Sequence, residues 1–379
     1  MAQRVKTDWL LFNTILLMVC FGVVMVYSAS SVTAHWKFDS STHFSLRQLG
    51  WAVGSFIVLM YCKKRDYRVM RSPQFAFAAL GVVLIMLIAV YFVDARTHRW
   101  FRFPLGSIQP SEFAKPALIL FLSYFLTRRT HLINDRQTIL QASLALTVLA
   151  VTVVVADLGT AIVLVVTALI MFFVAGLDWK YFGVAVAVIL LSAGVAVAVK
   201  PYRLARVIGF VDPEFLILDA VDSSGKIKKY MSDSVAGRDG GYQIRQALIA
   251  IGSGGFAGLG LMGSNQKWLF LPESHTDTIY AVVGEELGFG GCVAILVGFL
   301  IIAWRGLRLF WTAPDDFGRY LALGVTVSIV IQALINISVV LDLGPTKGIP
   351  LPMISFGGSS LLSTLLCLGM LMSVSEQAG

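Results

Sequence analysis

Long apolar runs separated by short charged segments dominate this chain. A helix that crosses the roughly 30 Å hydrocarbon core of a bilayer needs about 20 predominantly apolar residues. Ten runs reach or approach this length, and we predict that each forms a transmembrane helix. They cover approximately residues 9–28, 46–62, 75–93, 112–127, 139–155, 160–176, 181–199, 280–304, 318–340 and 356–374.

The composition agrees with this pattern. Of the 379 residues, 57% are hydrophobic and 14% are charged, whereas a typical soluble domain carries about 25% charged residues. A water-soluble globule is therefore excluded. The block pattern also excludes an outer-membrane barrel, whose strands alternate apolar and polar residues. We predict an all-α polytopic membrane protein in which residues 1–379 form a single integral membrane domain.

The distribution of positive charge predicts the orientation. With the N-terminus inside, more than twice as many Lys and Arg residues fall in cytoplasmic segments as in the short outer loops. Because these residues resist translocation, we expect both termini to be cytoplasmic. The net charge of +8 is then explained by topology and contact with anionic lipid, without a nucleic-acid partner. The four cysteines and five histidines show no disulfide framework and no metal-ligand spacing.

One connection is much longer than the others. Residues 200–279 join the seventh and eighth predicted spans on the outer face, and loops of this length are usually functional or disordered. Charged residues, Ser and Gly in 216–240 indicate a mobile insertion. Four apolar residues then follow at helical spacing: Ile244, Ala247, Leu248 and Ile251. They predict an amphipathic helix that lies either at the membrane interface or packed on the loop.

A glycine-rich segment, 252–263, follows this helix. It contains a match to G-x-G-x-x-G, but no strand precedes it and no nucleotide pool exists on the predicted side of the membrane. We expect its glycines to allow a turn or close backbone packing.

The next segment, Leu271–Asp277, concentrates ionisable groups. Glu273, His275 and Asp277 lie within five residues at the start of an apolar span, where charge is costly and usually functional or paired. Asp277 could cap the helix or act in catalysis, and its position alone favours neither. Ser274, His275 and Asp277 are sequence neighbours, so they do not indicate a Ser-His-Asp triad.

Other polar groups on the outer side could converge on this segment. Glu112 and Lys115 lie three residues apart on one helical face, where they form either an internal ion pair or part of a site. Glu285 and Glu286 are either a proton site or hydrogen-bonded structural acids, and we favour the structural role. Asp157 suits a tight turn between two spans. Candidate substrate-binding residues are Arg99, Arg203, Arg206, Lys267, His275, Lys347 and Ser359.

An enzyme acting on the outer face needs a substrate that is already activated, because cytoplasmic nucleotides are absent there. A lipid-linked pyrophosphate meets this requirement. Its leaving group needs cationic partners, and the acceptor hydroxyl needs a carboxylate base, for which Asp277 is the candidate. Only one carboxylate is strongly placed, which favours a single inverting displacement over a covalent double displacement.

The chain resembles the SEDS (shape, elongation, division, sporulation) family. The resemblance covers nearly the whole chain and rests on six motifs in family order: Gln109–Lys115, Asp157–Thr160, Pro201–Arg203, Leu271–Asp277, Gly284–Gly288, and Pro345–Gly348 with Gly357–Ser360. It implies a ten-span peptidoglycan glycosyltransferase of the bacterial cytoplasmic (inner) membrane. Such an enzyme polymerises lipid II into nascent glycan beside a class B penicillin-binding transpeptidase and divisome regulators.

The resemblance also assigns roles to residues. It implies that Asp277 is essential and that Glu112 and Lys115 form an ion pair in a central cavity. Lys347 favours the division branch of the family over the elongation branch. Ala205 and the long insertion 216–240 depart from the division pattern.

Two other functions remain open at this point. The same intramembrane charges could serve a lipid II flippase in which Glu285 or Glu286 couples transport to protons, or the chain could be a scaffold that activates its transpeptidase. No cofactor is evident from the sequence, and a divalent cation that assists the pyrophosphate is neither indicated nor excluded.

Overall fold

The computed structural model describes residues 7–94, 97–103, 106–199, 203–204, 207–208, 210, 235–268, 270–345 and 347–378, with 235–240 described by their backbone alone. Each of the ten predicted spans coincides with a helix. These are α1 (Trp9–Phe38), α2 (His43–Lys64), α3 (Pro73–Val93), α4 (Pro110–Arg128), α5 (Arg136–Ala156), α6 (Leu158–Val174), α7 (Trp179–Ala198), α12 (Ile279–Thr312), α13 (Asp316–Val340) and α14 (Gly358–Ser375).

Seven of these helices, α1, α3, α5, α7, α12, α13 and α14, are long and apolar enough to cross a membrane by length and composition. Within the described ranges, a short 3₁₀ helix, η1 (Tyr67–Arg71), and an antiparallel hairpin of β1 (Phe101–Phe103) and β2 (Gly106–Ile108) were not predicted. Helix α1 continues well beyond the predicted residue 28. It ends where Asp39 adopts a left-handed conformation with φ of 52°.

Polar residues between the apolar runs set several helix starts. The side chains of Asp8, Ser72, Asp135, Asp157 and Asp315 each accept a hydrogen bond from a backbone N–H in the first turn that follows. Such caps satisfy donors that have no partner within the helix. The charged breaks in the sequence therefore fix where these helices begin.

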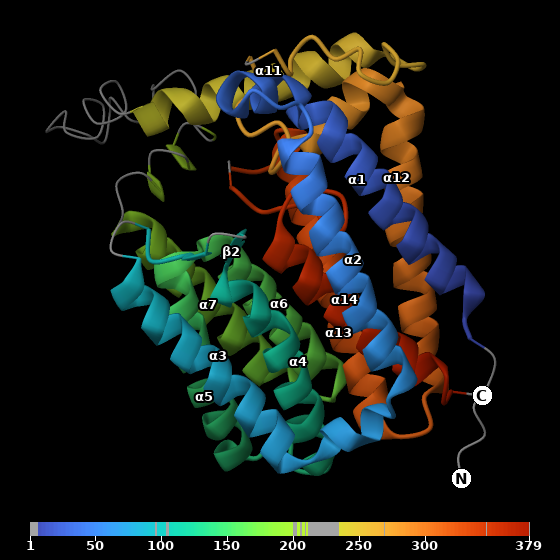
Figure 1. Ribbon diagram of the computed structural model, residues 1–379. Helices are drawn as coiled ribbons and strands as arrows, with labels where there is room; N and C mark the ends of the chain where they lie inside the picture. The colour runs from blue at the N-terminus through green and yellow to red at the C-terminus, as the bar shows by residue number, and fades with distance from the viewer. Residues whose placement is uncertain are drawn as a thin grey trace, which may run out of the picture.

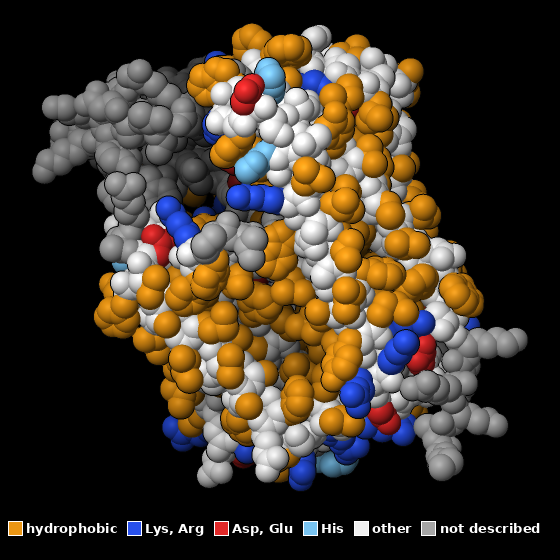
Figure 2. All heavy atoms as spheres, viewed as in Figure 1, with side chains coloured by type: hydrophobic (Ala, Val, Ile, Leu, Met, Phe, Trp, Pro, Cys, Tyr) orange, Lys and Arg blue, Asp and Glu red, His pale blue; other side chains and the backbone are white. Residues whose placement is uncertain are grey.

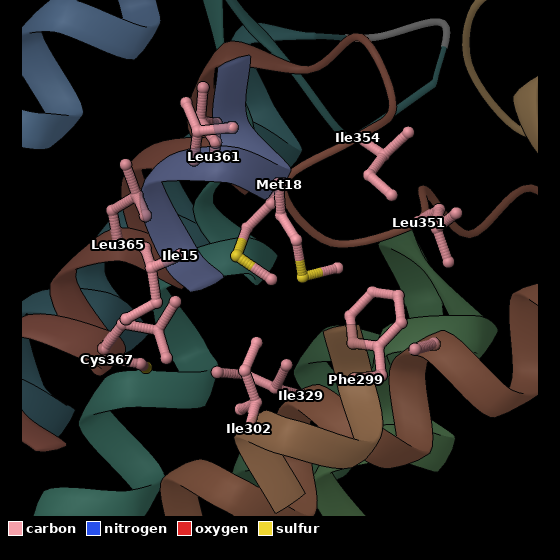
Figure 3. Packing of buried hydrophobic residues seen from close by; sticks show 14 of the residues in the cluster. Ile15, Met18, Phe299, Ile302, Ile329, Leu351, Ile354, Leu361, Leu365 and Cys367 are labelled. Carbon is pink, nitrogen blue, oxygen red and sulfur yellow. The ribbon is translucent and has the colours of Figure 1, made fainter. Parts of the chain in front are cut away.

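The helices form two packed groups that share α13 (Figure 1). One buried apolar cluster joins α1, α2 and α12–α14, and a second lies between α3, α4, α5 and α6 and reaches Tyr320 and Leu323 of α13. Figure 3 shows part of the first cluster, in which Met18 of α1 and Phe299 of α12 point toward each other. Burial of these side chains fixes the relative positions of the helix ends that carry the polar groups.

The two ends of the bundle differ in charge. The start of α1 and the end of α14 lie together, since Thr7 Oγ1 donates a hydrogen bond to Glu376 Oε1 at 3.2 Å. The helix α11 (Val235–Gly254) lies across the opposite end (Figure 1). Figure 2 shows hydrophobic side chains over the middle of the molecule and many Lys and Arg side chains near the end that holds the termini. Helix α7 has no buried residue, as expected of a lipid-facing helix.

Helix α11 packs on α12, a contact that does not distinguish between the two predicted arrangements. Its buried residues include Ala247 and Ala250, whereas Leu248 is 40% exposed, so protein covers only part of the predicted apolar face. The helix begins at Val235, within the stretch predicted to be a mobile insertion. Residues 216–234 of that insertion lie outside the described part of the chain.

The glycine-rich segment after α11 packs against a break in α12. Gly288 has φ of 65° and ψ of −160°, which interrupts the helix. Two carbonyls before the break accept hydrogen bonds from the segment: Glu285 from Leu259 N and Glu286 from Gly260 N, both at 2.9 Å. A Cβ on Gly258 would lie 2.2 Å from the carbonyl oxygen of Glu286. The glycines thus allow the close backbone approach predicted for them.

Candidate active site

A cavity of about 220 Å³ opens near the α5–α6 turn, at the end of the bundle that carries α11. Among its lining residues are three cationic side chains, Arg99, Arg203 and Lys347, and one carboxylate, Asp157. The remaining lining residues are Ala156, Leu158, Gly159, Val197, Val207, Pro345 and Gly348. Among the described residues, positive charge therefore exceeds negative charge around this cavity, which suits an anionic ligand.

Asp157 organises one wall of the cavity. As the N-cap of α6, its carboxylate accepts hydrogen bonds from Gly159 N at 2.9 Å and from Thr160 Oγ1 at 3.0 Å. The same carboxylate accepts from Arg99 Nη2 at 2.9 Å and from Gln109 Nε2 at 3.2 Å. The turn predicted for Asp157 is present, and the residue also orients the Arg99 guanidinium.

Arg203 and Lys347 complete the cationic lining. Arg203 donates to two backbone carbonyls, Val154 O at 2.9 Å and Ala196 O at 3.2 Å, which fixes the guanidinium between α5 and α7. Lys347 lies in the loop between α13 and α14. Burial lowers the pKa of its ammonium group, an effect that the nearby Asp157 carboxylate opposes and Arg203 reinforces. An anion that entered the cavity would further stabilise the charged form.

Asp277 lies beside this cavity and shares Lys347 with it. A second pocket, of about 20 Å³, is lined by Asp277 and Lys347 together with Gln243, Ile244, Ala247, Thr278, Val339 and Val340. A Cβ on Gly348 would lie 2.6 Å from Asp277 Oδ2, so the carboxylate contacts the loop next to Lys347. The N-cap of α12 is Thr278, whose side chain makes no capping hydrogen bond, and Asp277 directly precedes it.

Glu112 and Lys115 form a buried ion pair. Lys115 Nζ lies 2.8 Å from Glu112 Oε2 and 2.6 Å from Gln332 Oε1 on α13, and the two charged side chains are 5% and 2% exposed. Ser363 on α14 donates to the Glu112 carbonyl at 2.7 Å. The pair joins α4, α13 and α14 and is not part of the lining of the cationic cavity.

Three predicted substrate-binding residues do not line the cavity. Lys267 is buried, where its Nζ lies 3.0 Å from Glu286 Oε1 and 2.6 Å from Met262 O. His275 packs between the rings of Phe44 and Phe356, and burial lowers its pKa. Ser359 Oγ accepts a hydrogen bond from Gln109 N at 3.2 Å.

Each of these three side chains is buried against local protein partners, so the structure does not bring them together with the residues of the cavity. Arg206, which was also predicted to bind substrate, lies outside the described residues.

Glu285 and Glu286 are both hydrogen-bonded, which agrees with the structural role that we favoured. Glu285 accepts from Ser264 Oγ and from Asn265 N, the latter at 2.9 Å. Glu286 accepts from Ser28 Oγ of α1 at 2.6 Å and pairs with Lys267. Both carboxylates are at most 1% exposed. They hold α1, α12 and the glycine-rich segment together.

Sequence reasoning missed the buried amides of the site. Gln109 contacts Asp157, Gln332 contacts Lys115, and Asn336 contacts the backbone of Asp277. For Gln332 and Asn336 the available signal was an amide within an apolar span, because such a group needs a hydrogen-bond partner when it is buried. Within the described ranges, no group of three or more His, Cys, Asp or Glu side chains could hold a metal ion.

The fold and the polar groups define a multi-pass helical membrane protein with a cation-lined cavity beside a carboxylate. Comparison with known proteins identifies the family. Residues 8–379 match the cell cycle protein family of FtsW, RodA and SpoVE. The chain therefore belongs to this family, and the resemblance found from its motifs is confirmed.

Two curated relatives match almost end to end. Stage V sporulation protein E of Bacillus subtilis (strain 168) is 37% identical over 99% of this chain and 98% of its own length. Probable peptidoglycan glycosyltransferase FtsW of Geobacter sp. (strain M18) is 36% identical over 98% of this chain and 97% of its own length. On the basis of Lys347 we favoured the division branch of the family, to which FtsW belongs, over the elongation branch, to which RodA belongs.

Solved structures show the same fold. A chain from the work "Structural coordination of polymerization and crosslinking by a peptidoglycan synthase complex" superposes with a TM-score of 0.76 and 25% identity, covering 99% of both chains. The rod shape determining protein RodA of Thermus thermophilus superposes with a TM-score of 0.68 and 22% identity, over 99% of this chain and 98% of its own.

Proposed function

We propose that this chain is a peptidoglycan glycosyltransferase that polymerises lipid II into glycan strands for the division septum. Its family and the relatives named as probable peptidoglycan glycosyltransferases support the reaction class. The observation that carries the proposal is the position of Asp277. Asp277 lines a small pocket together with Lys347, which also lines the cation-rich cavity. A base and a binding site for a leaving pyrophosphate therefore lie next to each other.

The proposed reaction is a single displacement. Asp277 accepts the proton of the acceptor sugar hydroxyl, whose oxygen attacks the anomeric carbon of the donor. The bond from that carbon to the pyrophosphate oxygen breaks, and the configuration inverts. Arg99, Arg203 and Lys347 stabilise the negative charge that develops on the undecaprenyl pyrophosphate. The reaction needs no organic cofactor, and any divalent cation would act as an additional partner of the pyrophosphate.

We further propose ten membrane crossings in the bacterial cytoplasmic membrane. Both termini then face the cytoplasm, and residues 200–279 lie on the outer face. The position of Thr7 next to Glu376, opposite α11, supports this orientation. The basic side chains near the same end also support it, since Lys and Arg are retained on the cytoplasmic side.

The proposed partner is a class B penicillin-binding transpeptidase, with divisome regulators around the pair. The superposed chain comes from a peptidoglycan synthase complex that coordinates polymerization and crosslinking. A common fold and 25% identity support a similar assembly here. We propose lipid II and the nascent glycan as the substrates that meet at the cavity.

The flippase alternative has weaker support. Its proton-coupling candidates, Glu285 and Glu286, are engaged in hydrogen bonds and in an ion pair with Lys267. A proton carrier must exchange its proton during each cycle, and breaking these buried contacts would be costly. The polar groups of the cavity instead lie near one end of the bundle, where an outer-face enzyme would meet its substrate.

The test compares wild type, Asp277→Ala and a matched control, Asp316→Ala, each purified with the transpeptidase and supplied with labelled lipid II. Asp316 is half-exposed, pairs only with the half-exposed Arg319 in the contacts described, and is not the N-cap of α13, which is Asp315. Loss of a general base is expected to slow polymerisation by about 10²–10⁴-fold, whereas the control should keep wild-type rates. Equal polymer from wild type and Asp277→Ala would remove this carboxylate from the mechanism.

A further inference from the structure

One buried amide joins the two segments that carry Asp277 and Lys347. Asn336 lies on α13 and is 2% exposed. Its Nδ2 donates to the carbonyl of Asp277 at 2.8 Å and to the carbonyl of Ile349 at 2.7 Å. Both hydrogens of one amide nitrogen are thus used to bring together two loops that are far apart in the sequence.

Three consecutive backbone carbonyls in the segment before α12 accept hydrogen bonds, and Asn336 provides the third of these bonds. The carbonyl of His275 accepts from Phe356 N at 2.9 Å, and that of Thr276 accepts from Ser355 Oγ at 2.6 Å. The next carbonyl along the segment is that of Asp277, and it accepts from Asn336 Nδ2. The first two bonds come from the 349–356 loop itself, whereas the third comes from a rigid helix.

The hydrogen bond from Asn336 to the Ile349 carbonyl also restrains Gly348, the residue that contacts the Asp277 carboxylate. Ile349 directly follows Gly348, the residue at which a Cβ would lie 2.6 Å from Asp277 Oδ2. Lys347 directly precedes Gly348. Because Asn336 holds the carbonyls of Asp277 and Ile349, it limits how far the carboxylate and the Lys347 loop can move apart.

A neighbouring amide on the same helical face extends the restraint. Gln332 lies four residues before Asn336, so the two side chains project from one side of α13. Its Nε2 donates to Pro350 O at 2.9 Å, and its Oε1 accepts from Lys115 Nζ at 2.6 Å. The loop of Lys347 is therefore held at two successive residues, Ile349 and Pro350, by one helix.

We infer that Asn336 is a positioning residue, which sets the placement of the Asp277 carboxylate relative to Lys347. The inference rests on the proposed glycosyltransferase activity and deepens it. Leucine has nearly the same size but donates no hydrogen bond, so Asn336→Leu should leave the two carbonyls unpaired and let the loops separate. A displacement of about 1 Å at a reacting group can slow catalysis by roughly 10²-fold.

The experiment measures polymerisation of labelled lipid II by the full chain with its transpeptidase. Lipid II binding stoichiometry is measured on the same samples, so that kcat is expressed for each binding-competent molecule. We expect Asn336→Leu to lower this kcat by at least about 10-fold, with KM and stoichiometry within twofold of wild type. The kcat of Asn336→Ser, which keeps one hydrogen-bond donor, should lie between those of wild type and Asn336→Leu. Should the leucine variant not fold, the serine variant provides the same comparison.

A control separates positioning from general destabilisation. Thr326 is also buried on α13, and its hydroxyl donates within the helix, to Ala322 O at 2.7 Å. Thr326→Val should keep the wild-type kcat. If the rate of Asn336→Leu falls only in proportion to its binding stoichiometry, or does not fall, the positioning role is refuted. Inactive wild type, or equal rates for wild type and Asp277→Ala, would instead refute the proposed function.

Discussion

Removal of the cation from the buried Glu112–Lys115 pair should destabilise the protein strongly. In Lys115→Met the methionine fills much of the lysine volume, but it leaves the Glu112 carboxylate, 2% exposed, without the partner at 2.8 Å. Gln332 Oε1 also loses the donor at 2.6 Å. Stranding one charge of a buried pair costs about 3–5 kcal/mol.

This cost corresponds to a measurable change in melting temperature. An unfolding entropy of about 2.1 cal/mol/K per residue gives roughly 0.8 kcal/mol/K for 379 residues. A loss of about 3–5 kcal/mol should therefore lower Tm by about 4–6 °C. Thermal unfolding of the purified protein in detergent, followed by intrinsic fluorescence, measures the shift. Because Gln332 also holds Pro350 at 2.9 Å, we expect polymerisation to decrease as well.

Two further variants make the interpretation specific. Lys180 is exposed, so Lys180→Met should melt with the wild type. Glu112→Gln combined with Lys115→Met removes both charges and should recover much of the lost stability, because no charge is then left unpaired. Tm and turnover within error of wild type for Lys115→Met alone would show that the pair is solvated, against the burial described above.

Two other predictions concern the loop between α13 and α14. Gly348→Ala should lower kcat by about 10-fold or more, because the new Cβ would lie 2.6 Å from Asp277 Oδ2 and must displace it. The matched control is Gly344→Ala, whose Cβ meets no atom within 4 Å. Equal rates for the two variants would contradict the contact between Gly348 and Asp277. Burial lowers the pKa of Lys347, so pyrophosphate binding should be complete below that pKa and weaken as pH rises through it. A KM profile from neutral to alkaline pH should therefore rise earlier in wild type than in Lys347→Arg, whose guanidinium stays charged, and identical profiles would exclude Lys347 from binding.

Much of the architecture could be predicted from the sequence because its signals are local. The length of each apolar run defines a helix, and polar residues such as Asp135 and Asp157 mark helix starts. The spacing of Glu112 and Lys115 placed both on one helical face, and the structure shows them paired. Asp277 stood out because a carboxylate at the start of an apolar span needs a reason to be there.

Tertiary structure decided which polar groups meet. The Lys115–Gln332 bond joins residues 217 positions apart, and the Asn336–Asp277 bond joins residues 59 apart. No local pattern distinguishes Lys267, which is consumed by a buried pair with Glu286, from Lys347, which lines the cavity. Hydrophobic periodicity reports only whether a segment is buried in lipid or protein. The partner of a buried charge is set by how helices pack, and that depends on side chains from the whole chain at once.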